Sequence, residues 1–188
     1  MAKELLKLTR GVPPTEILPV ERLSESARAA LEQYGDQVLQ YGPSRGFLPL
    51  REQVAKETNT RADQVILGQG SLSLLDLCIR LLVEPGDLVY TEEPTYDRTL
   101  TLLRRGGARI EGIPLEDDGP DMGFLEHQLK RGDRPVLFYL IPDFQNPSGT
   151  VLSREKRSRL LALSRRFGFW IVEDIPYRRL RYRGLEAP

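Results

Sequence analysis

The sequence is poor in the residue types that several kinds of functional site require. Its 188 residues include one cysteine, Cys78, and one histidine, His127. A single cysteine excludes an internal disulfide. One histidine and one cysteine also give little support to a His/Cys metal site or a Ser-His-Asp triad, so we expect no metal. We expect His127 on a helix surface and Cys78 in the core.

Long apolar runs and an excess of one charge are also missing. No apolar run approaches the roughly 18 residues of a membrane span. Residues 1–10 carry charges where a signal peptide would have its apolar core. The 27 basic residues balance the 27 acidic ones, so nothing draws the whole chain to nucleic acid or anionic lipid. These absences predict a cytoplasmic protein with neither a membrane nor a nucleic acid as its partner.

Short apolar runs alternate with helical patterns from residue 64 onward. Strands are expected at 65–67, 88–90, 109–113, 136–141 and 169–172, and helices at 72–83, 96–105, 121–131 and 153–167. This alternation predicts an α/β fold in which a largely parallel sheet has helices on both faces.

The first part of the chain has a different pattern. A proline-rich stretch is followed by an expected helix over residues 20–34, which Gly35 can end. A second helix is expected at about 49–57, with Leu50 and Val54 facing inward. We therefore divide the chain into an N-terminal arm and helix, residues 1–40, and a larger domain, residues 41–188.

Candidate site residues follow the expected strands, because ligands of open α/β sheets bind at the carboxyl ends of the strands. Gly68-Gln69-Gly70 precedes Ser71, Leu72 and Ser73, which open a helix. Free N–H groups and the helix dipole at such a point favour a phosphate. The alternative is a plain turn with a serine cap.

Two loops present a side chain that suits a planar, oxygen-bearing ligand. Pro94 forces a turn that places Tyr96 beside the strand ends, where its ring either covers a ligand ring or only packs. Asn146 lies in a rigid loop with two prolines and a glycine. Its amide either donates to a ligand oxygen or closes an Asx-type turn.

Asp174 follows the expected strand at 169–172. A carboxylate at the end of a buried strand needs a cation or several hydrogen-bond donors. A protonated ring nitrogen would be a suitable partner, and a salt bridge to Arg178 or Arg179 is the alternative.

Taken in order, these motifs resemble a known family. The set comprises Tyr41-Gly42, Gly46, Leu50-Arg51, Gly70-Ser71, Leu75-Asp76-Leu77, Pro85-Gly86-Asp87, Glu93-Pro94-Thr95-Tyr96, Asn146-Pro147-Ser148-Gly149, Asp174 and Tyr177. It is similar to the fold-type-I, pyridoxal-phosphate (PLP)-dependent aminotransferases of class I/II, in the aspartate aminotransferase superfamily. The branch it resembles most holds 2-aminoadipate-type enzymes and the aminotransferase-like domain of GntR-type regulators.

The resemblance implies a role for each candidate residue. Asp174 would pair with the pyridine nitrogen of PLP, and Tyr96 would stack on the ring. Asn146 and Tyr177 would bind the phenolic oxygen of the ring. The phosphate would be held by Ser71, Leu72 and Ser73, together with Tyr41 of the partner subunit, which implies a homodimer. Gly11 and Asn146 would lie near the substrate.

The chain departs from the family pattern at two places. Leu72 and Ser73 stand where this branch often has glutamines. The family's Schiff-base lysine lies beyond the Asp-x-x-Tyr motif, whereas no lysine follows Tyr177 in this sequence. We therefore expect a PLP-binding large domain that is incomplete at its C-terminal end and lacks the small domain. No catalytic residue is assigned.

The function implied is transfer of an amino group between an amino acid and a 2-oxo acid, with little turnover by this chain alone. We expect it to need a second copy or a completing polypeptide. A non-catalytic effector domain of a GntR-type regulator is the alternative, disfavoured because only about ten residues precede Gly11. A nucleotide-binding domain would need a G-x-G-x-x-G or P-loop signature, which Gly68-Gln69-Gly70 does not complete.

Overall fold

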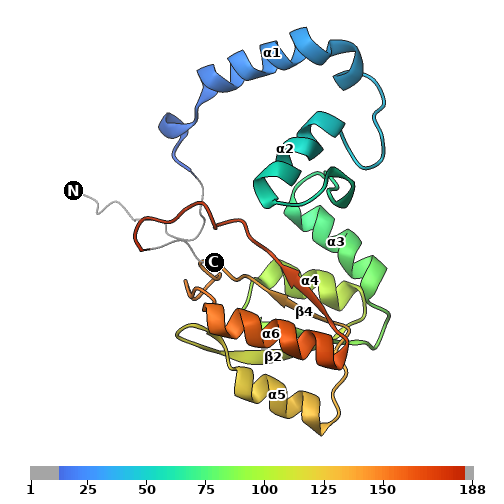
Figure 1. The fold of residues 1–188 in the computed structure, drawn as a ribbon, viewed down its shortest axis with the longest axis vertical. Coiled ribbons are helices and arrows are strands. Elements are labelled where there is room, and N and C mark those ends of the chain that lie inside the picture. The colour runs from blue at the N-terminus through green and yellow to red at the C-terminus, as the bar shows by residue number, and fades with distance from the viewer. Residues whose placement is uncertain (1–12, 185–188) are drawn as a thin grey trace, which may run out of the picture. The chain divides into compact units, whose positions relative to one another are not determined.

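The computed structural model describes residues 13–184, and the chain divides between Leu67 and Gly68 into two compact units. Figure 1 draws both. The sequence suggested a boundary at 40/41, so the compact division comes later in the chain. Gly11 lies outside the described residues.

Over residues 13–67, the first unit contains two helices and two short 3-10 turns. These are η1 (Thr15–Ile17), α1 (Val20–Val38), α2 (Leu48–Thr58) and η2 (Ala62–Gln64). The expectation that Gly35 ends α1 is wrong. The break falls instead at Tyr34, whose φ of −132° and ψ of 16° are non-helical, and the helix resumes to Val38. The Tyr34 ring meets Phe47 edge-on, with 5.2 Å between ring centroids.

The inward face of α2 differs from the expected one. Leu50 is 50% exposed, whereas Arg51 and Ala55 are buried. The Arg51 guanidinium donates from Nε to the carbonyl oxygens of Ala62 (3.2 Å) and Val65 (3.0 Å). A buried arginine must satisfy its donors, and these carbonyls do so, which turns the Arg51 face of α2 toward the segment after η2.

Residues 65–67 do not form the expected strand. A strand needs a neighbour to pair with, and the described residues give this segment none. The Leu67 N–H instead donates to the Arg45 carbonyl oxygen at 3.0 Å. The prediction of a strand from this apolar run is therefore wrong.

The second unit is built on a five-stranded sheet with the order β3-β2-β1-β4-β5. Its strands are β1 (Leu88–Glu93), β2 (Arg109–Glu116), β3 (Gly119–Pro120), β4 (Leu137–Leu140) and β5 (Trp170–Glu173). All neighbours are parallel except β3, which forms a short antiparallel pair with β2. The predicted parallel sheet is confirmed, and β3 was not predicted. Among the described residues β5 is an edge strand, and its Trp170 is 64% exposed.

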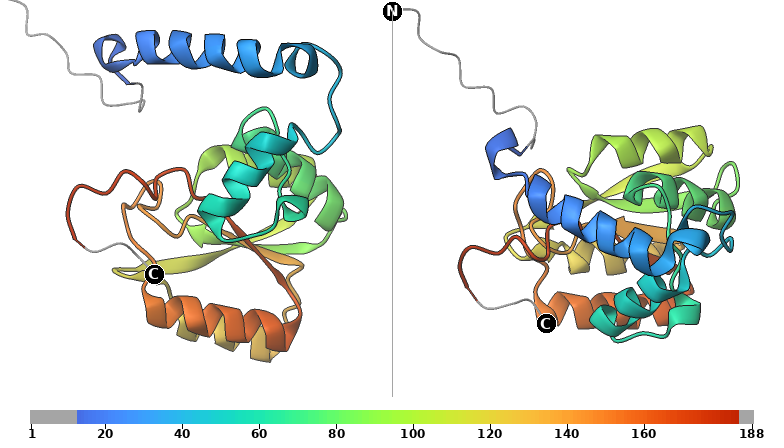
Figure 2. Two further views of the ribbon diagram at one scale, coloured as in Figure 1. Left: turned by 45° about the horizontal axis from the view of Figure 1, so that its top comes forward. Right: turned by 90° about the horizontal axis from the view of Figure 1, so that it is seen from above.

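Four helices cover both faces of this sheet, as predicted: α3 (Ser71–Leu82), α4 (Asp97–Arg105), α5 (Met122–Arg131) and α6 (Arg154–Phe167). Alternate residues of one strand enter two different cores, because successive side chains point to opposite faces. Phe138 and Leu140 of β4 pack with α5 and α6 in the first core. Leu137 and Tyr139 pack with α3 and α4 in the second core. Figure 2 shows α5 and α6 together beneath the sheet in its left view.

Local signals at the helix ends agree with the sequence. The Ser153 side chain caps α6 by accepting from the Lys156 N–H at 3.3 Å, as predicted. Gly168 ends α6 in the left-handed region, with φ of 78°.

Cys78 is exposed on α3, so the prediction that it lies in the core is wrong. Ile79 next to it faces the second core instead.

Candidate functional site

Asp174 lies where β5 ends, and its backbone N–H continues the ladder by donating to the Leu140 carbonyl at 2.9 Å. Its carboxylate accepts a hydrogen bond from the Tyr139 hydroxyl at 2.9 Å. Tyr139 is fully buried in the second core. Burial raises the pKa of Tyr139, so the hydroxyl remains a proton donor to Asp174 throughout the physiological range.

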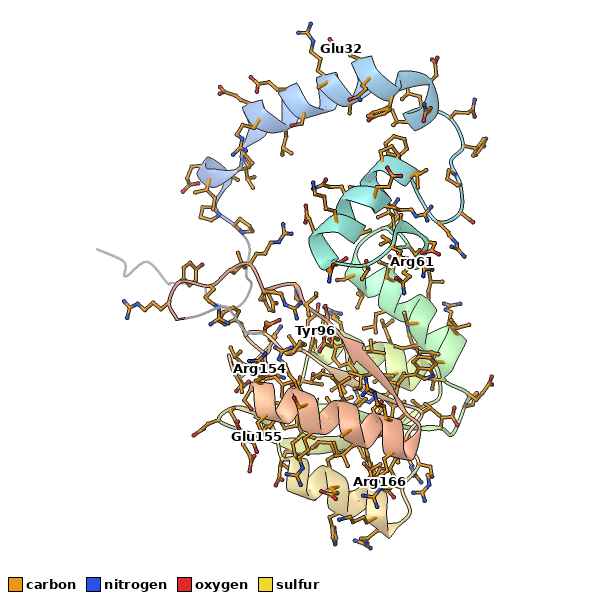
Figure 3. The ribbon with its side chains drawn as sticks, viewed as in Figure 1. Glu32, Arg61, Tyr96, Arg154, Glu155 and Arg166 are labelled. Atoms are coloured by element: carbon orange, nitrogen blue, oxygen red, sulfur yellow. The ribbon has the colours of Figure 1, made fainter. Side chains whose placement is uncertain are left out.

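Tyr96 and Tyr177 gather on the same side of the sheet as Tyr139. Both are half-buried and pack against the second core, the one formed with α3 and α4. Tyr96 is the residue before α4, and Tyr177 follows Asp174 by three positions. Figure 3 labels Tyr96 near the strand ends. Two aromatic rings and one carboxylate therefore share one side of the sheet.

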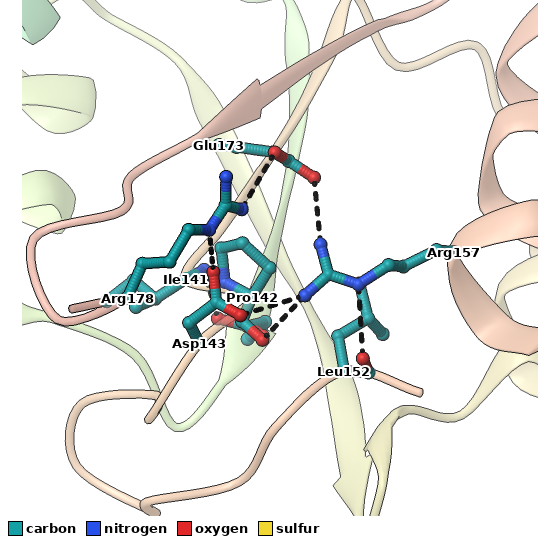
Figure 4. A network of polar contacts seen from close by, with 8 residues as sticks. Ile141, Pro142, Asp143, Leu152, Arg157, Glu173 and Arg178 are labelled. Carbon is teal, nitrogen blue, oxygen red and sulfur yellow. Dashed lines mark hydrogen bonds and ion pairs between the residues drawn. The ribbon is translucent and has the colours of Figure 1, made fainter. Parts of the chain in front are cut away.

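Arg178 is engaged away from Asp174. Its guanidinium Nε donates to Asp143 Oδ2 at 2.7 Å, and its Nη2 lies 3.9 Å from Glu173 Oε2. Arg157 of α6 lies 3.0 Å from Asp143 and 3.7 Å from Glu173, so the two arginines and the two carboxylates form a closed ring of ion pairs. Figure 4 shows this ring. It joins the loop after β4 to the segment after β5, which carries Asp174 and Tyr177.

Asn146 is half-buried, and its neighbour Gln145 is 2% exposed. The Gln145 amide nitrogen donates to the Pro94 carbonyl at 2.8 Å and to Glu92 Oε2 at 3.2 Å. Its amide oxygen accepts from the Ser148 N–H at 2.9 Å. The loop that carries Asn146 is thus attached to the turn that carries Tyr96.

Glu92 anchors this attachment from inside β1, where it is 2% exposed. Its Oε2 also accepts from the Ile141 N–H at 2.9 Å. Burial raises the pKa of the Glu92 carboxyl to about 7, against the opposing effect of the hydrogen bonds from Ile141 and Gln145.

The N-terminus of α3 has the features of an anion site. Gly70 adopts φ of 90°, a conformation that favours glycine, and no side chain caps the helix. A Cβ at Gly68 would lie 2.5 Å from Leu74, so this glycine allows the loop to approach the helix closely. Ser71, Leu72 and Ser73 are exposed. The Ser73 hydroxyl donates back to the carbonyls of Gln69 (3.0 Å) and Gly70 (2.9 Å), which leaves the first-turn backbone N–H groups as the donors for a ligand.

Tyr41, which was predicted to act from the partner subunit, belongs to the first unit and is 99% exposed. Two lysines of the second unit, to which no site role was assigned, are engaged in ion pairs. Lys130 pairs with Glu126 on α5, and Lys156 of α6 pairs with Asp118 at 2.7 Å. Both lysines thus lie on the helices of the first core, on the opposite face of the sheet from Tyr96 and Tyr139.

Sequence reasoning missed three residues that hold the site together: Tyr139, Glu92 and Gln145. Two of them carried a usable signal. Tyr139 is the polar-tipped residue of an apolar strand, and period-two alternation places it on the face of Leu137. Glu92 is a carboxylate within a buried strand, which requires donors nearby. Gln145 carried no signal, since its partner Pro94 lies 51 positions away.

An open parallel sheet carries a carboxylate, two aromatic rings and an uncapped, glycine-led helix at its carboxyl ends, an arrangement whose chemistry suits a planar ligand with an anionic group. The sequence profile of the family "Aminotransferase class I and II" matches residues 3–187. The chain therefore belongs to the aminotransferase class I/II family.

Individual relatives agree with this assignment. Aromatic-amino-acid aminotransferase 1 of Thermococcus litoralis is 37% identical over 96% of this chain and 46% of its own length. The crystal structure of an α-aminoadipate aminotransferase from Thermus thermophilus, complexed with N-(5'-phosphopyridoxyl)-L-leucine, is 37% identical, with a TM-score of 0.88 over 95% of this chain and 46% of that one. The transcriptional regulator YdfD of Bacillus subtilis is 29% identical over 94% of this chain and 37% of its own length.

The chain spans about half the length of the curated relatives it matches. Within residues 13–184, every helix is too short or too polar to cross a membrane.

Proposed function

We propose that this chain forms the cofactor-binding core of a PLP-dependent aminotransferase, which transfers an amino group between an amino acid and a 2-oxo acid. The observation that carries the proposal is the position of Asp174. Its carboxylate is held by the Tyr139 hydroxyl beside two half-buried tyrosines, at the carboxyl end of β5. An ionised carboxylate has several lone pairs, so it can accept a further hydrogen bond from a protonated ring nitrogen.

The chemistry of the surrounding side chains fits this cofactor. Tyr96 would lie on the ring face, and Asn146 and Tyr177 would donate to the phenolic oxygen of the ring. Asp174 would keep the ring nitrogen protonated, and Tyr139 would hold the Asp174 carboxylate in place. When bound, PLP supplies an electron sink for the amino-acid substrate.

The uncapped N-terminus of α3 fits the phosphate. Backbone N–H groups of Ser71, Leu72 and Ser73 would donate to it, and the helix dipole favours the negative charge. Tyr41 would reach the same phosphate from the partner subunit, so we propose that the chain acts as a homodimer. A completing polypeptide is the other partner that it could need. Gly11 would lie near the substrate. The single cysteine supports a cytoplasmic location.

Covalent attachment of the cofactor requires a lysine that this sequence does not place after Tyr177. Lys130 and Lys156 are engaged in ion pairs on the first-core helices. We therefore expect these 188 residues to hold the cofactor by noncovalent contacts alone, with little turnover.

The experiment is a calorimetric titration of the chain with pyridoxamine 5'-phosphate, which has no aldehyde and cannot react with surface lysines. Asp174→Asn removes the charge that pairs with the ring nitrogen, and a charge-assisted hydrogen bond contributes about 1.5–3 kcal/mol. We expect its affinity to fall by about tenfold or more. The control Asp117→Asn alters an exposed carboxylate and leaves the affinity unchanged. Equal affinity of the Asp174→Asn variant and the unaltered chain would contradict the proposal.

The similarity to YdfD favours a second candidate function, an effector-binding domain of a GntR-type regulator. Both candidates use the same cofactor site, so ligand binding does not separate them. The discriminating observation is the product of the whole gene. A winged helix-turn-helix segment and binding to its own promoter DNA would indicate the regulator, and transamination of an amino acid with a 2-oxo acid would indicate the enzyme.

A further inference from the structure

Gln145 has an unusual number of polar contacts for one buried side chain. Its amide nitrogen donates to Glu92 and to the Pro94 carbonyl. Its amide oxygen accepts from both the N–H (2.9 Å) and the hydroxyl (2.7 Å) of Ser148. At 2% exposure these bonds have little competition from water, so losing them would leave several buried polar groups unsatisfied.

These contacts join two segments that are distant in sequence. Pro94 lies two residues before Tyr96, and Ser148 lies two residues after Asn146. The backbone of the second loop is closed on itself by the Gln145 N–H, which donates to the Thr150 carbonyl at 2.9 Å. Gln145 is therefore the one side chain, among the described hydrogen bonds, that touches both the turn before Tyr96 and the loop around Asn146.

Glu92 fixes the orientation of this amide. Its Oε2 accepts from Gln145 and from the Ile141 N–H at the end of β4, so one oxygen connects β1, β4 and the loop. The Pro94 carbonyl and an ionised Glu92 carboxylate only accept, which requires that the Gln145 nitrogen and not its oxygen faces them. The same orientation directs the second amide hydrogen to the Pro94 carbonyl.

We propose that Gln145 is a positioning residue, which couples the placement of Tyr96 to that of Asn146 through the Pro94 carbonyl, with Glu92 as its anchor. The proposal rests on the proposed function, because Tyr96 and Asn146 are there the residues that meet the cofactor ring. Gln145 itself touches neither cofactor nor substrate. Because Gln145 joins the turn before Tyr96 to the loop around Asn146, a ligand that fixes the position of one of these segments finds the other already in its binding position.

The first test is ligand-independent and reads the Pro94 hydrogen bond directly. The Thr95 amide nitrogen belongs to the same peptide unit as the Pro94 carbonyl, so its ¹⁵N chemical shift reports on the bond that Gln145 donates. Gln145→Met keeps the length of the side chain and removes both amide groups. We expect it to move the Thr95 signal together with the Ser148 signal. The control Gln53→Met, on the exposed face of α2, should move neither. A shift at Ser148 with Thr95 unchanged would overturn the coupling.

The second test measures the coupling in affinity for pyridoxamine 5'-phosphate. Tyr96→Leu, which removes the aromatic ring, and Asn146→Ala are made singly and together, in the unaltered chain and in Gln145→Met. We expect Gln145→Met to weaken binding about tenfold. The two site substitutions should be non-additive in the unaltered chain and additive in Gln145→Met. The same degree of non-additivity in both backgrounds would overturn the proposal.

An exchanged pair separates positioning from simple stabilisation. In Glu92→Gln with Gln145→Glu, the new amide at 92 can donate to the new carboxylate at 145, which still accepts from Ser148. The Pro94 carbonyl loses its donor. We expect the unfolding midpoint to recover relative to Gln145→Met, while the Thr95 shift and the additivity do not. Recovery of all three would mean that Gln145 acts only on stability. If the unaltered chain fails to bind the ligand, the proposed function falls, and the Thr95 shift still decides the coupling.

Discussion

The buried Glu92 carboxyl predicts how the stability of this chain depends on pH. Its pKa is raised from 4.5 to about 7, mainly because burial disfavours the charged form. The folded state therefore binds the proton more tightly than the unfolded state does. This contribution to stability is complete below pH 4.5 and is lost as the pH rises to 7.

The magnitude follows from the size of the shift. A change of one pKa unit corresponds to about 1.4 kcal/mol, so the full effect is about 3 kcal/mol, of which about 2.5 kcal/mol is lost between pH 5 and pH 8. Glu92→Gln cannot titrate, and its amide oxygen can still accept from Ile141. Between pH 5 and pH 8, we expect the unfolding free energy of this variant to fall by about 2.5 kcal/mol less than that of the unaltered chain.

The assay is urea unfolding followed by far-ultraviolet circular dichroism at half-unit steps from pH 5 to pH 8. The matched control is Glu93→Gln, which changes the same charge at the next position of β1, where the side chain is exposed. It should follow the unaltered chain. If the unfolding free energy of Glu92→Gln varies with pH in parallel with the unaltered chain, the argument from burial is refuted.

Two further predictions concern the loops of the site. Gly70→Ala forces φ of 90° on a residue with a Cβ, so we expect it to lower the unfolding free energy by about 1–2 kcal/mol and to weaken the binding of pyridoxamine 5'-phosphate. The control Gly35→Ala lies inside α1 and should be neutral or stabilising. Equal effects of the two substitutions would contradict this account of the α3 N-terminus. Asp143→Asn removes a carboxylate that is 1% exposed and that pairs with Arg157 and Arg178. We expect this variant to lose about 3 kcal/mol of unfolding free energy, measured by urea unfolding, and the control Asp117→Asn to lose less than about 0.5 kcal/mol. A loss below about 1 kcal/mol in Asp143→Asn would contradict the role assigned to this ring of ion pairs.

The fold could be predicted from the sequence wherever a local residue pattern is compatible with only one structure. Apolar runs flanked by turn residues located β1, β2, β4 and β5, and the alternation with helices specified a parallel sheet. The cap at Ser153 is a local interaction, so it could be read locally. The β3 pair, at Gly119–Pro120, was missed because two residues are too few to leave a pattern.

Failures occurred where the outcome depends on a distant partner. Residues 65–67 have the composition of a strand, but a strand exists only when a neighbour pairs with it. Leu50 looked like a core residue of α2, yet Arg51 is buried because the carbonyls of Ala62 and Val65 satisfy its guanidinium. The choice between these faces lies outside the helix itself.

The candidate site shows the same division. Asp174, Asn146 and Tyr96 could be proposed from the rule that ligands bind after parallel strands. The side chains that hold them, Tyr139, Gln145 and Glu92, act through contacts between residues 35 to 53 positions apart. Such contacts follow from the strand register and could not be read from local spacing.

We propose that Asp174 faces the protonated pyridine ring of the cofactor. The direct measurement is the ¹⁵N chemical shift of pyridoxamine 5'-phosphate labelled at the ring nitrogen and bound to the chain at pH 8. We predict the shift of a protonated nitrogen in the unaltered chain and that of an unprotonated nitrogen in Asp174→Asn. An unprotonated ring nitrogen in both proteins, or a protonated one in both, would contradict the assignment of Asp174 and the cofactor site built around it.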